Sequence, residues 1–248
     1  MIAGSKKRFS HNKKSKIPAG RILYRGQTPT QSQSAMRSDS NQALLIDESG
    51  NASSERLLIV ATYVPRNGRP RFRKTAEQFP SRKTGRMEVK YSNTTAEERE
   101  SIFYDLDEQD FEIRDSSNYI LPPNITSFGL HRFGHNLSYP ESRYLYYLET
   151  IIKNAMDAHP GAIDIIMDSP PLNITDEIMR LCLLLIEEGY KIDWYTISPS
   201  RTITELQVHD FITGIDSDIV SDNIELNGNL SKTHKMKSTI DGLVKRKR

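Results

Sequence analysis

The apolar positions of this chain form short runs and longer periodic stretches, which predict strands and helices in alternation. Strands are predicted at 42–46, 56–64, 111–114, 162–168 and 191–197. Apolar residues three and four apart, together with capping residues, predict helices at 93–107, 141–158, 175–188 and 204–215. The first two strands flank a turn-rich segment, so they are expected to form a hairpin. Strands that alternate with helices favour an α/β fold, in which helices cover a sheet.

Charge is distributed unevenly along the chain. Residues 1–38 carry nine Lys or Arg and no acid, and residues 231–248 carry seven Lys or Arg with one acid. With +9 and +6 on these ends and a net charge of +2, the chain between them carries −13. The apolar fraction of 36% and the mean hydropathy of −0.58 are low for a chain that is folded throughout. An acidic body between basic ends suits a protein that holds a nucleic acid and presents carboxylates to it.

The two basic ends hold few apolar residues, so they cannot bury enough surface to offset the entropy lost on ordering. We expect a basic disordered arm at 1–40 and a basic disordered tail at 223–248. Such arms are drawn to polyanions by counterion release, and a merely solubilising role is the alternative. A ribonucleoprotein or a protein is a further possible partner of these ends. The expected nucleic-acid-binding residues are Lys6, Lys7, Arg8, Lys13, Lys14, Lys245, Arg246, Lys247 and Arg248.

Cys182 is the only cysteine, and it lies in an apolar stretch where a buried, inert thiol is expected. A disulfide within the chain is therefore excluded, which is typical of a reducing compartment. The basic N-terminus lacks the apolar core of a signal peptide, and no apolar run is long enough to span a bilayer. We expect a cytoplasmic protein without a membrane partner.

Carboxylates stand at the ends of two predicted strands. Asp47 and Glu48 follow the first apolar run, and Asp168 closes the fourth. Open α/β sheets place ligand sites at the carboxyl ends of their strands. Ionised carboxylates against an apolar sheet are costly unless a cation or hydrogen bonds balance them. The alternative is ordinary turn chemistry, because Asp-Glu-Ser-Gly is also a common turn sequence.

A third acid, Asp210, lies on the last predicted helix, where Gln207 shares its face. Carboxylates that converge from two strands and a helix favour Mg²⁺ or Mn²⁺, and a pair of such ions can promote phosphodiester hydrolysis. The predicted metal ligands are Asp47, Glu48, Asp168 and Asp210. Lys90 could place a charge beside a phosphate, although a solvated lysine at a strand end is the commoner explanation.

Three histidines are candidates for other chemistry. His131 and His135 have the spacing of zinc ligands on a helix, but Gly134 and the polar surroundings favour a loop and argue against zinc. His209 stands next to Asp210, and adjacent helical positions point in different directions, so a packing role is favoured over proton transfer.

The segments 45–51, 88–90, 198–200 and 206–214, with the strand that ends in Asp168, resemble the DUF3800 family. The resemblance extends over about residues 40–216 and implies a DUF3800-like domain at 41–222. That family is similar to ribonuclease H-like folds, so the resemblance implies a mixed five-stranded sheet with helices on both faces. It also implies an acidic set of Asp47, Glu48, Asp168 and Asp210, supported by Gln207, with Lys90 as the basic member.

Three functions remain open at this point. The first is a metal-dependent nuclease, a hydrolase whose catalytic residues are Asp47, Glu48, Lys90, Asp168 and Asp210 and whose substrate is RNA or DNA. The second is a catalytically silent nucleic-acid or ribonucleoprotein-binding module, whose affinity falls with salt but survives EDTA. The third is a structural protein whose acids cap turns.

Overall fold

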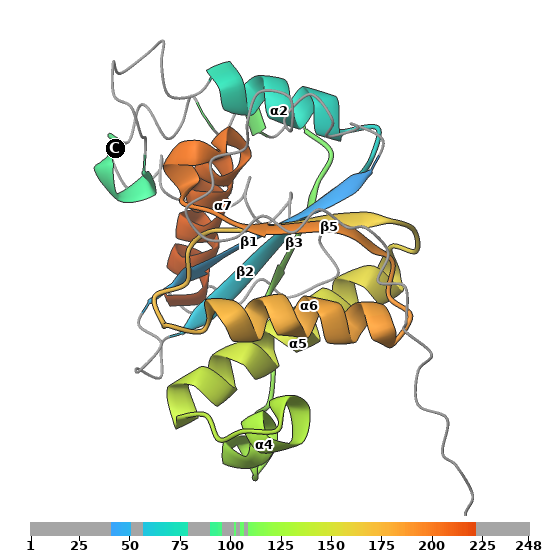
Figure 1. Ribbon diagram of the computed structural model, residues 1–248. Helices are drawn as coiled ribbons and strands as arrows, with labels where there is room; N and C mark the ends of the chain where they lie inside the picture. Colours follow the sequence, from blue (N-terminus) through green and yellow to red (C-terminus); the bar gives the residue numbers. More distant parts are fainter. Residues whose placement is uncertain are drawn as a thin grey trace, which may run out of the picture.

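The chain folds into a mixed sheet with helices on both faces (Figure 1). The structure is a computed structural model, and it describes residues 41–50, 57–78, 90–95, 102, 105–106 and 109–221. The strands in this part of the chain are β1 (Gln42–Ser49), β2 (Leu58–Val64), β3 (Glu112–Asp115), β4 (Ile163–Met167) and β5 (Ile192–Ile197). The α-helices are α2 (Arg69–Gln78), α4 (Phe128–Phe133), α5 (Tyr139–Ala158), α6 (Thr175–Glu187) and α7 (Thr204–Ser221). Short 3₁₀ helices are η1 (Tyr91–Asn93), η2 (Ile125–Ser127) and η3 (Ser200–Thr202).

β1 lies at the centre of the sheet, whose strand order is β3-β2-β1-β4-β5. β2 is antiparallel to β1 and β3, whereas β4 is parallel to β1 and β5. The predicted hairpin and the predicted α/β class are therefore confirmed. The parallel strands β1, β4 and β5 also share one carboxyl edge, which is where α/β sheets commonly bind ligands.

Each face of the sheet packs against its own set of helices (Figure 1). α4, α5 and α6 cover one face, and α2 and α7 cover the other. Alternation along β1 sends Leu44 and Ile46 into the first core and Ala43 and Leu45 into the second. Because β1 is buried on both faces, its sequence is a continuous apolar run rather than an alternating one.

β1 continues further than its apolar run predicts. The strand was expected to end at Ile46, but it extends to Ser49, and Asp47 and Glu48 pair with Val60 and Ile59 of β2. The expected turn at Asp47 and Glu48 is therefore wrong, because hairpin pairing with β2 holds both residues in the strand. Gly50 follows at φ 87°, a conformation that favours glycine.

Two helices were not predicted, and one is longer than predicted. α2 lies in a basic segment with few apolar residues, and it is anchored by the buried side chains of Arg69 and Phe72. α4 lies where a loop was expected, although Gly134 ends it at φ 79°. α7 continues six residues beyond its predicted end at 215, to Ser221.

The predicted arm at 1–40, the predicted tail at 223–248, most of the predicted helix at 93–107 and the first two residues of the segment 88–90 lie outside the described residues.

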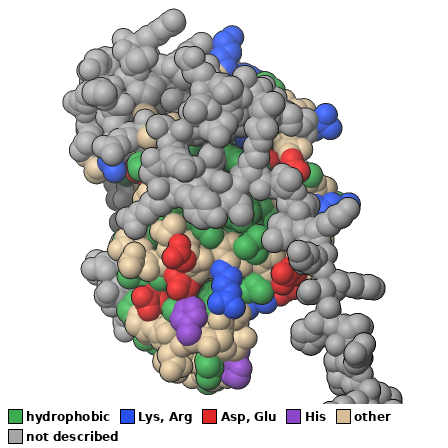
Figure 2. Space-filling view, viewed as in Figure 1, with side chains coloured by type: hydrophobic (Ala, Val, Ile, Leu, Met, Phe, Trp, Pro, Cys, Tyr) green, Lys and Arg blue, Asp and Glu red, His purple; other side chains and the backbone are tan. Residues whose placement is uncertain are grey.

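Ion pairs join the helices on the α5 side. Arg132 contacts Glu149 at 3.0 Å and also pairs with Glu188, and Lys153 lies 2.7 Å from Glu149 and 3.0 Å from Glu188. Figure 2 shows acidic, basic and histidine side chains mixed on the described part of this face, where α4 to α6 lie. These surface pairs are solvent-exposed in part, so each adds little to stability.

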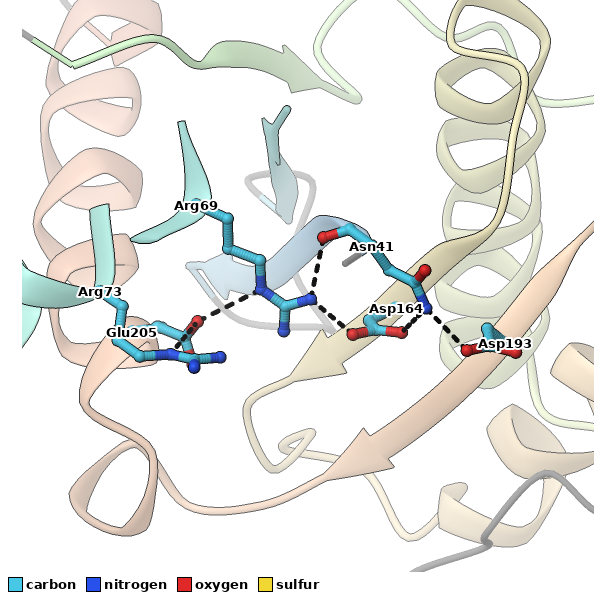
Figure 3. A network of polar contacts seen from close by, with 6 residues as sticks. All are labelled: Asn41, Arg69, Arg73, Asp164, Asp193 and Glu205. Carbon is cyan, nitrogen blue, oxygen red and sulfur yellow. Dashed lines mark hydrogen bonds and ion pairs between the residues drawn. The ribbon is translucent and has the colours of Figure 1, made fainter. Parts of the chain in front are cut away.

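A buried polar network lies at the edge of the sheet opposite the carboxyl edge, where β1, β4 and β5 begin (Figure 3). The fully buried Arg69 donates from Nη1 to Asp164 Oδ2 at 2.5 Å and to the Asn41 carbonyl at 3.1 Å. Its Nε lies 3.6 Å from Glu205 Oε1 at the start of α7. Asn41 in turn donates to Asp164 at 3.2 Å and to Asp193 at 2.7 Å. Glu205 also lies 3.4 Å from Arg73 Nε, so two guanidinium groups of α2 balance the two buried carboxylates and tie α2 and α7 to the sheet.

Candidate active site

The two central parallel strands bring Asp47 and Asp168 to the same edge of the sheet. Ile46 lies opposite Met167 in the β1–β4 ladder, and the backbone N–H of Asp168 donates to the Ile46 carbonyl at 3.0 Å. The next residue of each strand is an aspartate, so the two acids are neighbours across the ladder. Asp47 is only 8% exposed. Residues 121 positions apart in sequence therefore meet as the carboxyl-edge rule leads one to expect.

Strand alternation separates Asp47 from Glu48. Asp47 follows the register of Leu45, which lies in the core beneath α7, whereas Glu48 follows that of Ile46, which faces α5. Tyr144 of α5 donates its hydroxyl hydrogen to Glu48 Oε2 at 3.1 Å. The four predicted acids thus approach the sheet edge from two faces, with Glu48 on the α5 side.

α7 brings Asp210 to the α2 and α7 side of this edge. Asp210 Oδ2 accepts a hydrogen bond from the backbone N–H of Tyr91 at 2.8 Å. The ring of Tyr91 packs edge-on against Phe211, with centroids 5.9 Å apart, and a Cβ at Gly214 would lie 2.3 Å from that ring. The glycine therefore lets η1 sit directly on α7. Lys90, the residue before η1, is exposed beside this junction.

His209 fixes the position of α7 on the sheet. It is fully buried, with Nδ1 2.9 Å from Thr62 Oγ1 and Nε2 3.2 Å from the Val60 carbonyl. Burial lowers the pKa of His209 to about 3, so the ring is neutral at neutral pH. The neutral tautomer that fits both contacts donates from Nε2 to Val60 and accepts at Nδ1 from Thr62. The predicted packing role is confirmed.

The acids at this edge are electrostatically coupled. Burial raises the pKa of Asp47 well above its usual range, and the charges of Glu48, Asp168 and Asp210 raise it further. Burial raises the pKa of Glu48 to about 7, opposed by the hydrogen bond from Tyr144 and supported by the charge of Asp168. The charges of all three other predicted acids thus raise the pKa of Asp47.

Several contacts oppose the effect of burial on the pKa of Asp168. Burial raises its pKa, while backbone hydrogen bonds and the charge of Lys90 lower it. Its Oδ1 accepts from the backbone N–H of Ser169 at 2.7 Å and of Ser200 at 3.1 Å. The structure therefore puts Lys90 within electrostatic reach of Asp168.

Gln207 acts on this group through the loop that precedes α7. Its amide lies 3.5 Å from the Ser200 carbonyl, at the edge of hydrogen-bond distance, and Ser200 donates to Asp168. The buried Gln207 side chain thus lies behind the loop that holds Asp168.

The sequence did not predict the contacts that Tyr144 makes with Glu48 and Tyr91 makes with Asp210. Tyr144 is fully buried, and burial raises the pKa of its phenol well above the usual range, so the hydroxyl stays protonated and donates. A signal for Tyr144 existed, because a tyrosine on the apolar face of a helix needs a partner for its hydroxyl. The contact of Asp210 with Tyr91 is made by a backbone N–H, which leaves no trace in the side-chain pattern.

The carboxylates suit a divalent cation in chemistry and charge, but their spacing is not that of an assembled site. Oxygen donors are the ligands that Mg²⁺ and Mn²⁺ prefer, and a cation would relieve the repulsion around Asp47. Among the described residues, no three Asp, Glu, His or Cys side chains are grouped closely enough to hold a metal ion. The acids therefore form a coupled group rather than a finished coordination shell.

The zinc possibility at His131 and His135 also lacks a site within the described chain. His131 lies in α4 and His135 follows Gly134, which ends that helix. His135 Nε2 lies 3.3 Å from Glu177 Oε1 of α6. The nucleic-acid-binding residues predicted in the arm and the tail lie outside the part of the chain that the structure describes.

No model of a known protein family matches the chain, and no curated protein matches it. None of the described helices is both long enough and apolar enough to cross a membrane.

Proposed function

We propose that this protein is a divalent-metal-dependent phosphodiester hydrolase that acts on nucleic acid, with a ribonuclease H-like architecture. The mixed five-stranded sheet with helices on both faces supports this architecture and agrees with the DUF3800 resemblance. The observation that carries the proposal is the position of Asp47, buried at the carboxyl edge and repelled by Glu48, Asp168 and Asp210. Strongly perturbed carboxylates of this kind gather at functional sites.

The roles follow from position. Asp47, Asp168 and Asp210 approach from the α7 side, and they are the proposed ligands of Mg²⁺ or Mn²⁺, with Glu48 completing the set from the α5 side. When bound, the ion would polarise the scissile phosphate and lower the pKa of a water. The hydrogen bonds from Ser169, Ser200 and Tyr91 hold one oxygen each of Asp168 and Asp210. The carboxylates are proposed to move closer together when the ion binds, because they are not grouped as a ligand set among the described residues.

Lys90 is the proposed contact to the substrate phosphate. It is exposed, and its charge reaches Asp168. An ammonium beside the acids stabilises negative charge on a phosphate that enters the site. The basic arm and tail, with Lys6, Lys7, Arg8, Lys13, Lys14, Lys245, Arg246, Lys247 and Arg248, are proposed to hold the polyanion nonspecifically.

The test is cleavage of labelled single- and double-stranded RNA and DNA with Mg²⁺, Mn²⁺ or EDTA. We expect metal-dependent cleavage by the wild type and a loss of about 100-fold or more in Asp47→Asn and Asp168→Asn. Asp193→Asn is the control, because Asp193 is exposed at the opposite edge, where it accepts from Asn41. Cleavage that survives in both site variants overturns the proposal.

One observation favours the second candidate, a binding module without catalysis. The described acids are not grouped as a ligand set for an ion. Such a module would bind nucleic acid with an affinity that falls steeply with salt. Binding that is unchanged by EDTA and by Asp47→Asn, without cleavage of any substrate, would favour this function over the hydrolase.

A further inference from the structure

We propose that Tyr144 is a positioning residue that holds Glu48 in the orientation the site needs. This inference rests on the proposed function, because it assigns Tyr144 to the same site. It concerns a side chain on α5, on the far side of the sheet from α7 and Asp210.

The geometry separates Glu48 from the three aspartates. Glu48 has the register of Ile46, so its side chain leaves β1 toward the core beneath α5. It still lies near enough for its charge to act on Asp47. The Glu48 side chain is flexible and starts on the face opposite the three aspartates. It therefore needs a constraint to stay at the edge of the sheet, since its rotamers otherwise interconvert freely.

Tyr144 supplies such a constraint. Its side chain is 0% exposed, and Leu145 and Leu148, its neighbours on α5, are equally buried in the same core. The packed ring cannot move without opening that core, so its hydroxyl is a fixed point. The hydroxyl donates to Glu48 Oε2 at 3.1 Å, and this bond engages one of the two carboxylate oxygens. Outer partners of this kind commonly contribute 10- to 100-fold to metal affinity or activity, by orienting the group that acts.

The chain offers a matched control for the tyrosine hydroxyl. Tyr63 lies in the same core as Tyr144 and donates its hydroxyl hydrogen to Gln42 Oε1 at 2.7 Å. That bond lies at the opposite edge of the sheet, near the start of β1. Tyr144→Phe and Tyr63→Phe therefore remove the same atom from the same core, and only the first removes a contact to the acidic group.

The experiment compares these variants on the nucleic acid that the wild type cleaves best, with Mn²⁺. We expect Tyr144→Phe to lower kcat about 10-fold with KM unchanged, and Tyr63→Phe to leave kcat within about 2-fold of the wild type. Urea unfolding should give similar small losses of stability for the two variants. Equal kcat values for Tyr144→Phe and Tyr63→Phe overturn the inference.

A double-mutant cycle separates positioning from general packing. If Tyr144 acts only through Glu48, adding Tyr144→Phe to Glu48→Gln should change kcat by less than about 2-fold. A further 10-fold loss in that background would mean that Tyr144 acts by another route, and it would overturn the inference.

The proposed function fails in a different way. A wild type that neither cleaves nucleic acid nor binds Mn²⁺ by calorimetry overturns the hydrolase and the role of Tyr144 together. Cleavage that is lost in Asp47→Asn but unchanged in Tyr144→Phe overturns the role of Tyr144 alone.

Discussion

At the edge where the parallel strands begin, Asp164 is 4% exposed and lies against the guanidinium of Arg69, whereas at the edge where they end, Asp47 is 8% exposed and lies among other acids. Both aspartates belong to central strands of one sheet, and both point to the side of α2 and α7. At the first edge a buried carboxylate has an arginine and an asparagine as partners (Figure 3). At the second, Asp47 accepts from the backbone N–H of Glu48 at 2.8 Å.

The difference shows that burial alone does not mark a functional acid. Asp164 and Glu205 are buried structural acids, because Arg69 balances Asp164 and the pair of Arg69 and Arg73 balances Glu205. Asp47 is held in an environment that raises its pKa through burial and through like charges. An arrangement of that kind lowers the stability of the fold, and proteins commonly tolerate such a cost where activity requires it. The comparison therefore indicates a structural role for the first edge and supports the function proposed for the second.

The largest expected effect comes from disrupting the edge where the parallel strands begin, called here the balanced edge because Arg69 pairs with Asp164 there. Arg69→Met keeps an apolar stem of similar length but leaves the buried Asp164 without its cation, while Glu205 keeps only Arg73 as an arginine partner. We expect a loss of about 3–5 kcal/mol in the free energy of unfolding, measured with urea. Arg114→Met is the control, because Arg114 pairs with Glu112 at a partly exposed position, where about 1 kcal/mol or less is expected. Equal losses in the two variants would contradict the comparison.

Much of the fold could be predicted from local pattern, because apolar runs and helical spacing depend on which residues must be buried. The strands around Leu45 and Ile166 and the helix around Leu148 are of this kind. The end of β1 could not be predicted in this way. Asp47 and Glu48 are poor strand residues, and they remain in β1 because β2 pairs with them. α2 was missed for a similar reason, since Phe72 is a single apolar anchor in a basic segment.

The candidate site could be predicted only in part. Asp47 and Asp168 were expected at one edge, because parallel strands share a carboxyl edge whatever their exact register. Glu48 lies on the opposite face of the sheet from Asp47 because β1 continues beyond Ile46. The apolar run did not reveal this extension. The contact between Glu48 and Tyr144 joins positions 96 residues apart, so it requires the fold itself.

The second effect is a dependence of stability on pH at the acidic edge. The pKa of Glu48 is raised from 4.5 to about 7, so the folded state holds this proton more tightly than the unfolded state. Stability from this group is present below about pH 4.5 and is lost as pH rises through 7, by about 3 kcal/mol.

His209 changes stability in the opposite direction. Its pKa is lowered to about 3, so stability from this group is lost as pH falls below 6.5. The measurement is therefore the difference between wild type and Glu48→Gln in urea unfolding from pH 4 to 8, in which the contribution of His209 cancels. The wild type should lose stability relative to Glu48→Gln as pH rises. Parallel curves would mean that Glu48 is not desolvated as the structure indicates.

The third effect is a gain in stability when the central acid is neutralised. Asp47→Asn removes a carboxyl group that burial and the neighbouring acids make costly to ionise, so at pH 8 we expect the free energy of unfolding to increase by about 1 kcal/mol. Asp193→Asn, at an exposed position of the balanced edge, should change it by less than about 0.5 kcal/mol. A loss of stability in Asp47→Asn would show that its carboxylate is structural, like that of Asp164.

The smallest effect concerns Lys90, the cation that acts on the acidic edge. Because Lys90 is exposed, Lys90→Gln should change the free energy of unfolding by less than about 0.5 kcal/mol. Its charge lowers the pKa of Asp168, so its removal should raise that pKa, as followed by carboxyl carbon chemical shifts during a pH titration. Lys153→Gln is the control, because Lys153 pairs with Glu149 and Glu188 on the outer face of the helices. If both substitutions leave the titration of Asp168 unchanged, Lys90 is a solvated surface lysine, and the acidic edge lacks the phosphate contact proposed for it.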